Sequence, residues 1–397
     1  MLRSVTFARD TSLVRHLASL ASWRDPRSKL WQSTRTGRER ICANIRSKFV
    51  AALVILLAST SSVESSSEAL LTEINKLPLQ QRQKRLEDGA RREGAFKFYG
   101  ISNAALLGAY ASGFMKKYPY IKAEFWRGSG NKLVFRTLTE HRTRKLDTDA
   151  VLVGTENVMT LKRSGIWVRY DSPESQFFSK DYYDKDGYWH ADSLGISTVA
   201  YNNRLVKKEE APKGYDELSD SKWKGNLSID MEPERALMAW LVAWGEQRTR
   251  AFVEGLMKNG ALVRRGHTLQ AQLLCAGEFK VAVEIYPDAI LRMRNDGCPA
   301  SIVFPNPTPA HISGAIGIYA NAPHPHAAAL FVDFMKSVEG AKILASTGRI
   351  SGRKGVKSFY EELANLEERV PLLVVTPEQS EQVAKPMEKI MKEILTR

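Results

Sequence analysis

The fold class of this 397-residue chain is decided by the segment GEFKVAVEIYPDAILRMRNDGCPASIVFPNPTPAHISGAIGIYANAPHPHAA, Gly277 to Ala328. Its first apolar run, Val281 to Ile285, stops at Tyr286-Pro287-Asp288, and a helical stretch follows before the next apolar run, Ile302 to Phe304. Strand, turn, helix and strand in this order are typical of a βαβ unit, so the sequence predicts an α/β fold with mostly parallel sheets. Ligands of such sheets bind at the carboxyl ends of the strands, which makes this turn the first candidate site.

The same order of apolar strand, polar turn and helix recurs along the chain in two sets of three. One further strand, Gly195 to Asn203, leaves the first set, and another, Ala315 to Tyr319, returns to it after a Pro-rich turn. This order predicts two lobes whose strand-end loops face each other across a cleft. The expected strands are 95–99, 121–126 and 150–153 in the first set, and 227–230, 261–264 and 280–285 in the second.

The expected domain limits follow from these two sets. Lobe 1 takes residues 95–196 and 313–397, and lobe 2 takes residues 197–312. Residues 67–94 are expected to form an N-terminal helix region ahead of the first strand. The amphipathic, charged tail from Phe359 onward is interpreted as helices that pack on lobe 1.

The N-terminal residues have the pattern of an export signal. Arg46 and Lys48 precede the apolar run Phe49 to Ala58, and small and polar residues follow it, which is typical of a secretory signal peptide at 46–66. The run is shorter than the ~20 residues that a membrane-spanning helix needs. Residues 1–45 are interpreted as a leader extension, whose composition suits either a transit peptide or a start codon placed too far upstream. We therefore expect a periplasmic protein.

The net charge of +14 does not indicate a nucleic-acid partner. Residues 1–62 hold 11 Lys or Arg and 3 acidic residues, so +8 of that charge lies in the leader and signal. The rest of the sequence shows neither a basic stripe interleaved with aromatic residues nor zinc-finger spacing. We expect no nucleic-acid partner.

Two cysteines, Cys275 and Cys298, remain once Cys42 in the leader is set aside. Export to an oxidising compartment allows a disulfide between them. Two small buried side chains are the alternative, and the spacing does not decide between the two. The sequence shows no four-ligand metal pattern, and we expect no cofactor.

Four segments of the chain resemble one known family. They are RRGHTLQAQLLCAGEFKVAVEIY (Arg264–Tyr286), ANAPHPHAAALFVDFMKSVEGAKIL (Ala320–Leu344), LPLQQRQKRLEDGARREG (Leu77–Gly94) and STVAYNNRLV (Ser197–Val206). The chain resembles the type II periplasmic solute-binding proteins of ABC transporters, in the group that includes ferric-ion binders. The resemblance implies two lobes joined by two crossover strands, which close on a small solute and present it to an ABC permease in the inner membrane. It also implies a monomer that is not an enzyme.

The resemblance implies a ferric site of carboxylate and phenol oxygens, of which this chain keeps a part. Glu156 stands where the ferric binders place a carboxylate, and Tyr286-Pro287-Asp288 stands where they place two adjacent tyrosines. Their histidine would fall near Ser102-Asn103, where none is present. Their anion-binding loop reads Glu234-Arg235-Ala236 here, and a carboxylate at a helix start repels a second anion. Ferric iron on Glu156, Tyr286 and Asp288 is therefore the alternative ligand.

The helix starts of lobe 1, at Ser102-Asn103 and at Ser129-Gly130-Asn131, favour an anionic solute, because free backbone N–H groups there attract negative charge. Arg127 would add a fork of donors for a carboxylate or phosphate. Plain N-capping would select the same Ser and Asn residues, so both interpretations stay open. The leading hypothesis is a small polar solute, an organic or phosphorylated anion, held at the strand ends. The candidate residues are Tyr99, Ser102, Asn103, Arg127, Ser129, Gly130, Thr155, Glu156, Glu232, Arg235, Arg265, His267, Thr268, Tyr286 and Asp288.

An enzyme on the same two-lobed fold is the competing class, with Glu156, Asp288 or His267 as acid or base. Neither a Ser in a strained Gly-rich elbow nor a Cys with a convincing His partner supports it. His311, just before the expected returning strand, is the weakest of the histidine candidates.

Overall fold

The computed structural model describes residues 66–395. The predicted leader (1–45) and signal peptide (46–66) therefore lie outside the described residues, apart from Ser66. Two helices, α2 (Ser66–Asn75) and α3 (Leu79–Glu93), precede the first strand, in the region where N-terminal helices are expected. None of the helices formed by the described residues has both the length and the apolar character needed to cross a membrane.

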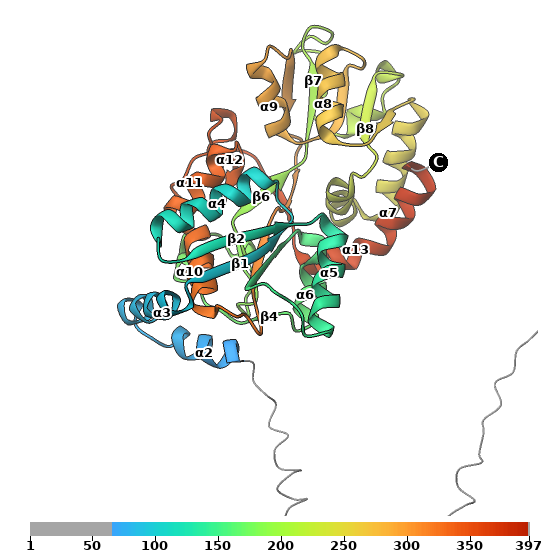
Figure 1. The fold of residues 1–397 in the computed structure, drawn as a ribbon. Helices are drawn as coiled ribbons and strands as arrows, with labels where there is room; N and C mark the ends of the chain where they lie inside the picture. Colours follow the sequence, from blue (N-terminus) through green and yellow to red (C-terminus); the bar gives the residue numbers. More distant parts are fainter. Residues whose placement is uncertain (1–65, 396–397) are drawn as a thin grey trace, which may run out of the picture. The chain divides into compact units, whose positions relative to one another are not determined.

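The first sheet contains the strands of the first predicted set (Figure 1). Its strands are β1 (Ala95–Gly100), β2 (Lys122–Arg127), β3 (Ala150–Val153), β4 (Trp167–Val168), β5 (His190–Ala191) and β13 (Ala315–Tyr319). The order is β2-β1-β3-β13-β4, with β5 paired to β13. β1 is parallel to β2 and β3, whereas β13, which returns from the second half of the chain, is antiparallel to its neighbours.

The second sheet has the same plan, with one antiparallel strand among parallel ones. Its order is β11 (Ala300–Val303), β7 (Thr198–Asn202), β10 (Val281–Ile285), β8 (Leu227–Asp230) and β9 (Leu262–Arg264). β7 is the antiparallel strand, because it enters from the first half of the chain. β10 is buried at every position, as an apolar strand covered on both faces should be.

A middle sheet carries both crossover connections and corrects two predictions. Its order is β14 (Ile350–Ser351), β6 (Ser193–Ile196), β12 (Thr308–Ile312) and β15 (Leu372–Val375). The run 195–203, expected as one strand, is divided at Ser197 into β6 and β7. The Pro-rich turn expected before residue 315 contains strand β12. Pro309 lacks an N–H, but its carbonyl accepts a hydrogen bond from Ser197 N at 3.0 Å, so strand pairing survives there.

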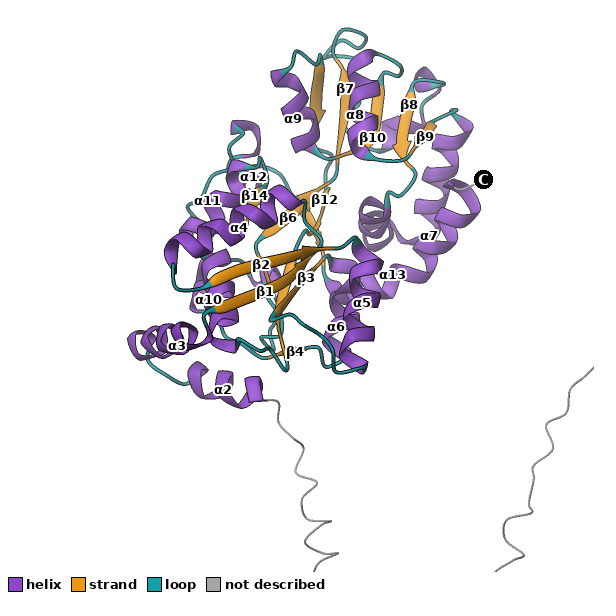
Figure 2. Ribbon diagram, viewed as in Figure 1, coloured by secondary structure: helices purple, strands orange, loops and turns teal. Residues whose placement is uncertain are grey.

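Helices flank the sheets (Figure 2), and α4 to α10 and α13 each follow a strand, whereas α11 follows α10 and α12 follows a 3-10 turn. The lobe limits 95–196, 313–397 and 197–312 remain predictions. The helices after β1 are α4 (Ala104–Lys117), α5 (Gly130–Arg142), α6 (Thr155–Arg163), α7 (Glu234–Lys258), α8 (His267–Ala276), α9 (Pro287–Asn295), α10 (Pro325–Lys336), α11 (Val338–Ser346), α12 (Leu366–Arg369) and α13 (Pro377–Ile390). Short 3-10 turns span 173–177, 180–182, 216–219, 221–223 and 361–363, and residues 391–395 form a π-helical turn.

Aromatic side chains fill the core of each half. Phe331 of α10 is fully buried, and its ring centroid lies 4.4 Å from that of Phe96 and 4.7 Å from that of Phe98. In the second half, Trp240 of α7 packs its ring 5.1 Å from that of Phe252. Along α7, Leu237, Met238, Trp240 and Leu241 are all buried, as core side chains should be.

Cys275 and Cys298 are joined by a disulfide, with an S–S distance of 1.98 Å. The bond links the end of α8 to the segment between α9 and β11, and both elements belong to the second half of the molecule. The alternative of two separate thiols is therefore excluded in this structure.

The tail departs from the prediction that it packs on lobe 1. Helix α13 contacts both α6, which follows the first sheet, and α7, which follows the second. Toward α6, Arg163 Nη2 donates to Glu381 Oε2 at 2.6 Å. Toward α7, Met387 and Ile390 join the apolar cluster around Trp240. The amphipathic pattern of the tail predicted an apolar face, but it carried no information about which helix would cover that face.

Candidate functional site

A cavity of about 740 Å³ lies among helix starts that follow strands of both sheets. The first turns of α5 and α6 border it from one side, and those of α7 and α8 from the other. Helix α13 supplies a further wall. Of the predicted site residues, Gly130, Glu156, Glu232, Arg235, Arg265, His267 and Tyr286 line this cavity.

Arg235 and Tyr286 form the centre of the site. Arg235 Nη1 donates a hydrogen bond to Tyr286 Oη at 3.1 Å. Tyr286 is the N-cap residue of α9, held extended by the following Pro287, and Arg235 lies in the first turn of α7. The Tyr286 ring also stacks on His267 of α8, with centroids 4.1 Å apart and ring planes at 16°. Three helix starts of the second half thus hold one rigid group of polar side chains.

The phenol of Tyr286 keeps its proton at neutral pH. Burial raises the pKa of Tyr286 to about 12, although the neighbouring Arg235 guanidinium acts in the opposite direction. Because the phenol oxygen already accepts from Arg235, the hydroxyl proton is available for donation to a bound group.

Two buried carboxylates fix the position of His267. Its Nε2 lies 2.6 Å from Glu284 Oε2, and its Nδ1 lies 3.5 Å from Asp230 Oδ2. Burial lowers the pKa of His267, but Glu284 and Asp230 outweigh it and leave that pKa above its ordinary value. Ser197, where β6 passes into β7, donates to Glu284 Oε1 at 3.0 Å. The cluster is therefore connected directly to one of the two crossovers.

Carboxylates dominate the rim of the large cavity. Glu232 is paired with Arg265 at 2.7 Å, and both side chains are largely exposed. Burial raises the pKa of Glu234, which makes it more readily protonated than an exposed glutamate. The rim can accept hydrogen bonds, whereas Arg235 at the centre can receive negative charge. The carboxylates among the lining residues are Glu156, Asp230, Glu232, Glu234, Glu381 and Glu388.

Several predicted site residues of the first half are engaged within the protein and do not line this cavity. Tyr99 is fully buried, and its hydroxyl donates to Glu140 Oε2 at 2.9 Å. Arg127 Nε donates to the backbone carbonyl of Ser102 at 3.3 Å. Thr155 Oγ1 donates to the carbonyl of Ile312 at 2.9 Å. These groups are used to hold strand ends and helix starts together.

The remaining predicted residues are also found outside the cavity lining. Asn103 caps α4, and its side chain accepts from Leu106 N at 2.8 Å. Ser129 is the N-cap residue of α5 without a side-chain capping bond, and Thr268 is exposed in the first turn of α8. The N-capping interpretation thus holds for Asn103.

The three oxygen ligands considered for ferric iron do not line one cavity. Glu156 lines the large cavity, Asp288 lines a smaller one of about 90 Å³, and Tyr286 lines both. Asp288 is also paired with Arg292 at 2.5 Å. Within residues 66–395, no group of three or more His, Cys, Asp or Glu side chains is arranged to hold a metal ion. A ferric site on these three oxygens would require a rearrangement of the helix starts that carry them.

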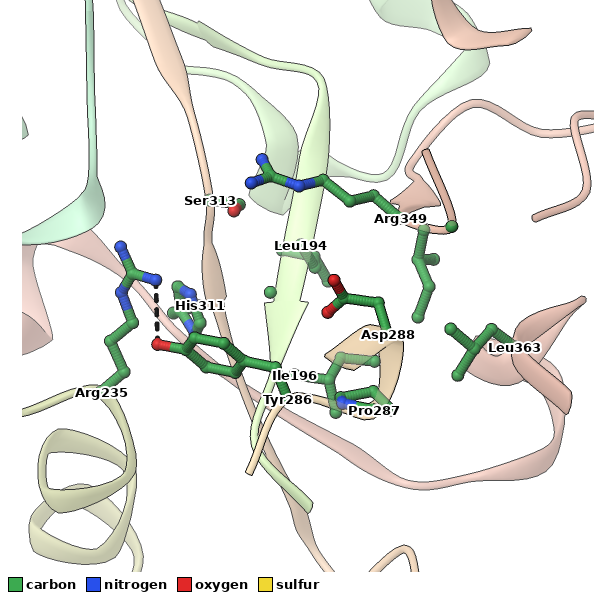
Figure 3. A pocket seen from close by; sticks show the side chains of 13 residues that line it. Leu194, Ile196, Arg235, Tyr286, Pro287, Asp288, His311, Ser313, Arg349 and Leu363 are labelled. Atoms are coloured by element: carbon green, nitrogen blue, oxygen red, sulfur yellow. Dashed lines mark hydrogen bonds between the residues drawn. The ribbon is translucent and has the colours of Figure 1, made fainter. Parts of the chain in front are cut away.

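The smaller cavity lies against the middle sheet and brings in His311, which the sequence analysis ranked as the weakest histidine candidate, and residues that it missed, Ser313 and Arg349 (Figure 3). It shares Arg235 and Tyr286 with the large cavity and adds His311, Ser313 and Arg349. His311 belongs to β12, the strand hidden by its prolines. Arg349 reaches the site only because β14 pairs with β6, and no local sequence signal predicts that pairing. Glu284 was also missed, although the sequence contains a signal for it, because it is a lone acidic residue within the apolar strand VAVEI.

The chain matches the profile of a known family over residues 152–376, and that family is described as bacterial extracellular solute-binding proteins. The match covers more than half of the chain, which therefore belongs to this family. A curated relative, iron uptake protein A1 of Synechocystis sp., is 28% identical over 242 residues, which cover 57% of this chain and 66% of that protein. An uncharacterised Haemophilus influenzae protein is 27% identical over 164 residues, 39% of this chain and 47% of its own length. The chain thus matches slightly less than two thirds of the first relative and about half of the second.

Solved structures share the fold at low sequence identity. Iron-bound HitA from Pseudomonas aeruginosa superposes with a TM-score of 0.66 at 19% identity, over 75% of this chain and 99% of that one. AfuA from Actinobacillus pleuropneumoniae, with exogenous fructose-6-phosphate bound, has a TM-score of 0.63 at 21% identity, over 77% and 99%. Trichodesmium IdiA (FutA), in complex with iron and citrate, has a TM-score of 0.64 at 19% identity, over 76% and 99%. The predicted type II periplasmic binding protein fold is confirmed.

Proposed function

We propose that this protein is the solute-binding component of an ABC importer and that it captures a small anionic, hydroxyl-bearing solute in the large cavity. Sugar phosphates and hydroxy acids are the solute classes that fit. Family membership supports the transport role. We propose in addition that the protein acts as a monomer with an inner-membrane permease, that residues 46–66 direct its export, and that it has no catalytic activity.

The observation that carries the anionic part of the proposal is the state of Arg235. Its side chain is half-buried at the cavity, and within residues 66–395 its hydrogen bond to Tyr286 is the one partner of its guanidinium. Four helices, α5, α6, α7 and α8, direct their first turns at the same space, and helix starts carry partial positive charge. A planar guanidinium beside helix starts suits a carboxylate or a phosphate.

The carboxylates on the rim support a solute that also carries hydroxyl groups. Glu156, on the first-sheet side, is exposed at the cavity, and Glu234 faces the same space from α7. Ionised carboxylates are pure acceptors, so they suit the O–H donors of a polyol and disfavour additional negative charge. The solute would then place one anionic group at the centre and its hydroxyl groups at the rim.

Closure would proceed by hinge bending at the crossovers. The chain passes between the halves at β6 to β7 and again at β12 to β13, with Ser197 at the division of the first crossover. A solute that contacts Glu156 on one side and Arg235 on the other stabilises the closed state by its differential contacts.

Isothermal titration of the exported chain against hydroxy acids, sugar phosphates, phosphonates and ferric citrate tests the proposal. We expect at least one of the anionic, hydroxyl-bearing solutes to bind with a Kd in the micromolar range or below and to raise the melting temperature. If no compound of the panel binds, or if only uncharged solutes bind, the proposal fails.

Ferric iron is the second candidate cargo, favoured by the similarity to iron uptake protein A1 of Synechocystis sp.. The phenol of Tyr286 is the strongest iron ligand at the site, and Glu156 is an exposed carboxylate on the first-sheet side of the cavity. Iron bound to Tyr286 would give a visible phenolate-to-iron absorption band that is lost in Tyr286→Phe. A protein that binds ferric salts with such a band, and binds none of the organic anions, would establish iron as the cargo instead.

A further inference from the structure

The smaller cavity is lined by hydrogen-bond donors that lack partners. Arg349 is half-buried at its wall and makes neither a hydrogen bond nor an ion pair with any residue of the described range 66–395. His311 is 1% exposed, and its Nε2 has no hydrogen-bond partner there. Ser313 lines the same space and its hydroxyl is likewise without a bond in the described part of the chain. A buried polar atom without a partner is costly, so His311 Nε2 calls for an explanation, whereas Arg349 and Ser313 are only partly buried.

The arrangement of these groups is convergent. Figure 3 shows the Arg349 guanidinium extending toward Ser313, with His311 and Arg235 on the other side of the same space. Gly195 on β6 makes room for the imidazole, because a methyl group there would lie 2.3 Å from His311 Nε2. The imidazole therefore packs directly over Gly195, at the wall of the cavity that both residues line.

The charge balance of the cavity excludes a cation. The single carboxylate among its lining residues is that of Asp288, which is already paired with Arg292 at 2.5 Å. Against it stand the two guanidiniums of Arg235 and Arg349. Burial lowers the pKa of His311 well below its ordinary value, and both guanidiniums act in the same direction, so the imidazole is neutral before a ligand enters. A negatively charged group would relieve this excess of positive charge.

We propose that the smaller cavity is a second binding site, specific for an oxyanion of the size of a phosphate or carboxylate group, held by Arg349, Ser313 and His311 with Arg235 at its edge. This site goes beyond the proposed solute cavity, since Arg349, Ser313 and His311 line only the smaller space. The oxyanion is either a free ion or the end group of a solute that spans both cavities.

The site would also connect the halves of the molecule. Arg235 belongs to α7 of the second half, whereas Arg349 precedes β14 of the middle sheet. An anion between the two guanidiniums therefore bridges elements on either side of the crossovers and stabilises the geometry in which both face it.

Titration with inorganic phosphate at low ionic strength tests the site, with wild type compared to Arg349→Gln and Lys357→Gln. Lys357 is exposed in the same segment and lines neither cavity, so its variant removes one positive charge without touching the site. We expect Lys357→Gln to bind phosphate like wild type and Arg349→Gln to bind at least tenfold more weakly, with melting curves that show both variants folded. Equal phosphate affinity in Arg349→Gln and wild type would overturn the proposal.

A spectroscopic readout covers the case in which phosphate alone binds too weakly for calorimetry. Ring ¹⁵N signals of His311 should shift on addition of phosphate or of a sugar phosphate in wild type, and they should not shift in Arg349→Gln. Unshifted His311 signals at saturation with both compounds would refute the site. Competition between phosphate and the solute identifies the source of the oxyanion. If the site takes a free ion, phosphate and the solute bind at the same time. If it takes the end group of the solute, the bound solute prevents phosphate from binding.

The outcomes also separate this site from the proposed function. If Arg235→Gln abolishes solute binding while Arg349→Gln changes neither phosphate nor solute binding, the solute cavity stands and the second site falls. If phosphate binds through Arg349 but no solute of the panel binds, the second site stands and the proposed function falls.

Discussion

The strand ends of the two sheets are equally polar, yet their side chains have different surroundings. In the first half, Tyr99 donates to Glu140 and Arg127 donates to the carbonyl of Ser102, so both polar groups have partners inside the protein. In the second half, Arg235 and Tyr286 bond chiefly to each other and line a cavity. The difference teaches that a polar residue at a strand end reaches a ligand only where its side chain faces the cavity, and the strand-end pattern alone does not decide this.

The same contrast appears in covalent structure. The second half contains the disulfide Cys275–Cys298, and it also supplies the central side chains of the candidate site. The first half contributes to the cavity mainly through the helix starts at Gly130 and Glu156. The second half thus supplies both the covalent cross-link and the central side chains of the site.

The largest expected effect is on stability, from removal of the disulfide. The double variant Cys275→Ser/Cys298→Ser should lose about 3 kcal/mol of unfolding free energy, because the bond closes a loop of 23 residues in the unfolded chain. Denaturant unfolding under oxidising conditions measures this loss. Solute affinity should stay within threefold of wild type, because the bond lies at the end of α8 opposite to His267. A large loss of affinity would contradict the idea of a locally rigid site.

The next largest effect is on binding, at the centre of the site. Arg235→Gln should weaken binding of an anionic solute about 100-fold, equivalent to about 2.8 kcal/mol, because the anionic group loses its half-buried, positively charged partner. Arg248→Gln is the matched control, since Arg248 lies on the same helix and pairs with exposed Asp216. Calorimetry on both variants measures the difference. Equal losses in the two would show that net charge, rather than the position of Arg235, governs binding.

His267, in the second half, should make the stability of the protein depend on pH. The pKa of His267 is raised in the folded state, so its pairing with Glu284 and Asp230 stabilises the protein fully below pH 6.5 and is lost as the pH rises through the folded pKa. Wild type should therefore lose melting temperature over that window relative to His267→Gln. Melting curves of both proteins from pH 5 to 9 provide the test. Parallel curves would mean that the pair contributes no pH-dependent stability.

A smaller effect is expected at Tyr99. Tyr99→Phe should cost about 1 kcal/mol of stability, because it removes one hydrogen bond to Glu140 and leaves the packing intact. Solute binding should not change, since Tyr99 lines neither cavity. Denaturant unfolding and calorimetry on the same preparation check both statements, and a loss of affinity without a loss of stability would return Tyr99 to the site.

The smallest effect is expected at Arg127. Arg127→Ala should change solute affinity by less than threefold, because the side chain is directed to the Ser102 carbonyl. A loss of affinity comparable to that of Arg235→Gln would mean that the Arg127 side chain turns into the cavity when the halves close. The contrast between the halves would then hold only for the present conformation.

Much of the fold followed from the sequence because strands and helix starts leave local signals. The apolar run 281–285 and the cap residue Asn103 are such signals, and both are found where the pattern placed them. The type II fold itself rested on longer segments such as 264–286. The prediction failed at β12, where Pro309 has the composition of a turn while its carbonyl still takes part in strand pairing.

The candidate site was harder to predict, because it depends on which residues find partners. Nothing local to Tyr99 shows that Glu140, 41 residues later, will accept its hydroxyl proton. Arg349 lies far from the other site residues in sequence, and only the pairing of β14 with β6 brings it beside Arg235. Sequence pattern locates the strand ends, but the side-chain partners are decided by tertiary packing.

Helix α13 has a consequence for how the molecule can move. Its Glu381 is tied to Arg163 of α6 and its Ile390 to the core around α7, so the halves share a third attachment besides the two crossover strands. Because three segments connect the halves, any separation of the halves must stretch or bend α13. Pro386 interrupts the backbone hydrogen bonding of this helix at one point. The flexibility of α13 would therefore limit how far the two halves can separate.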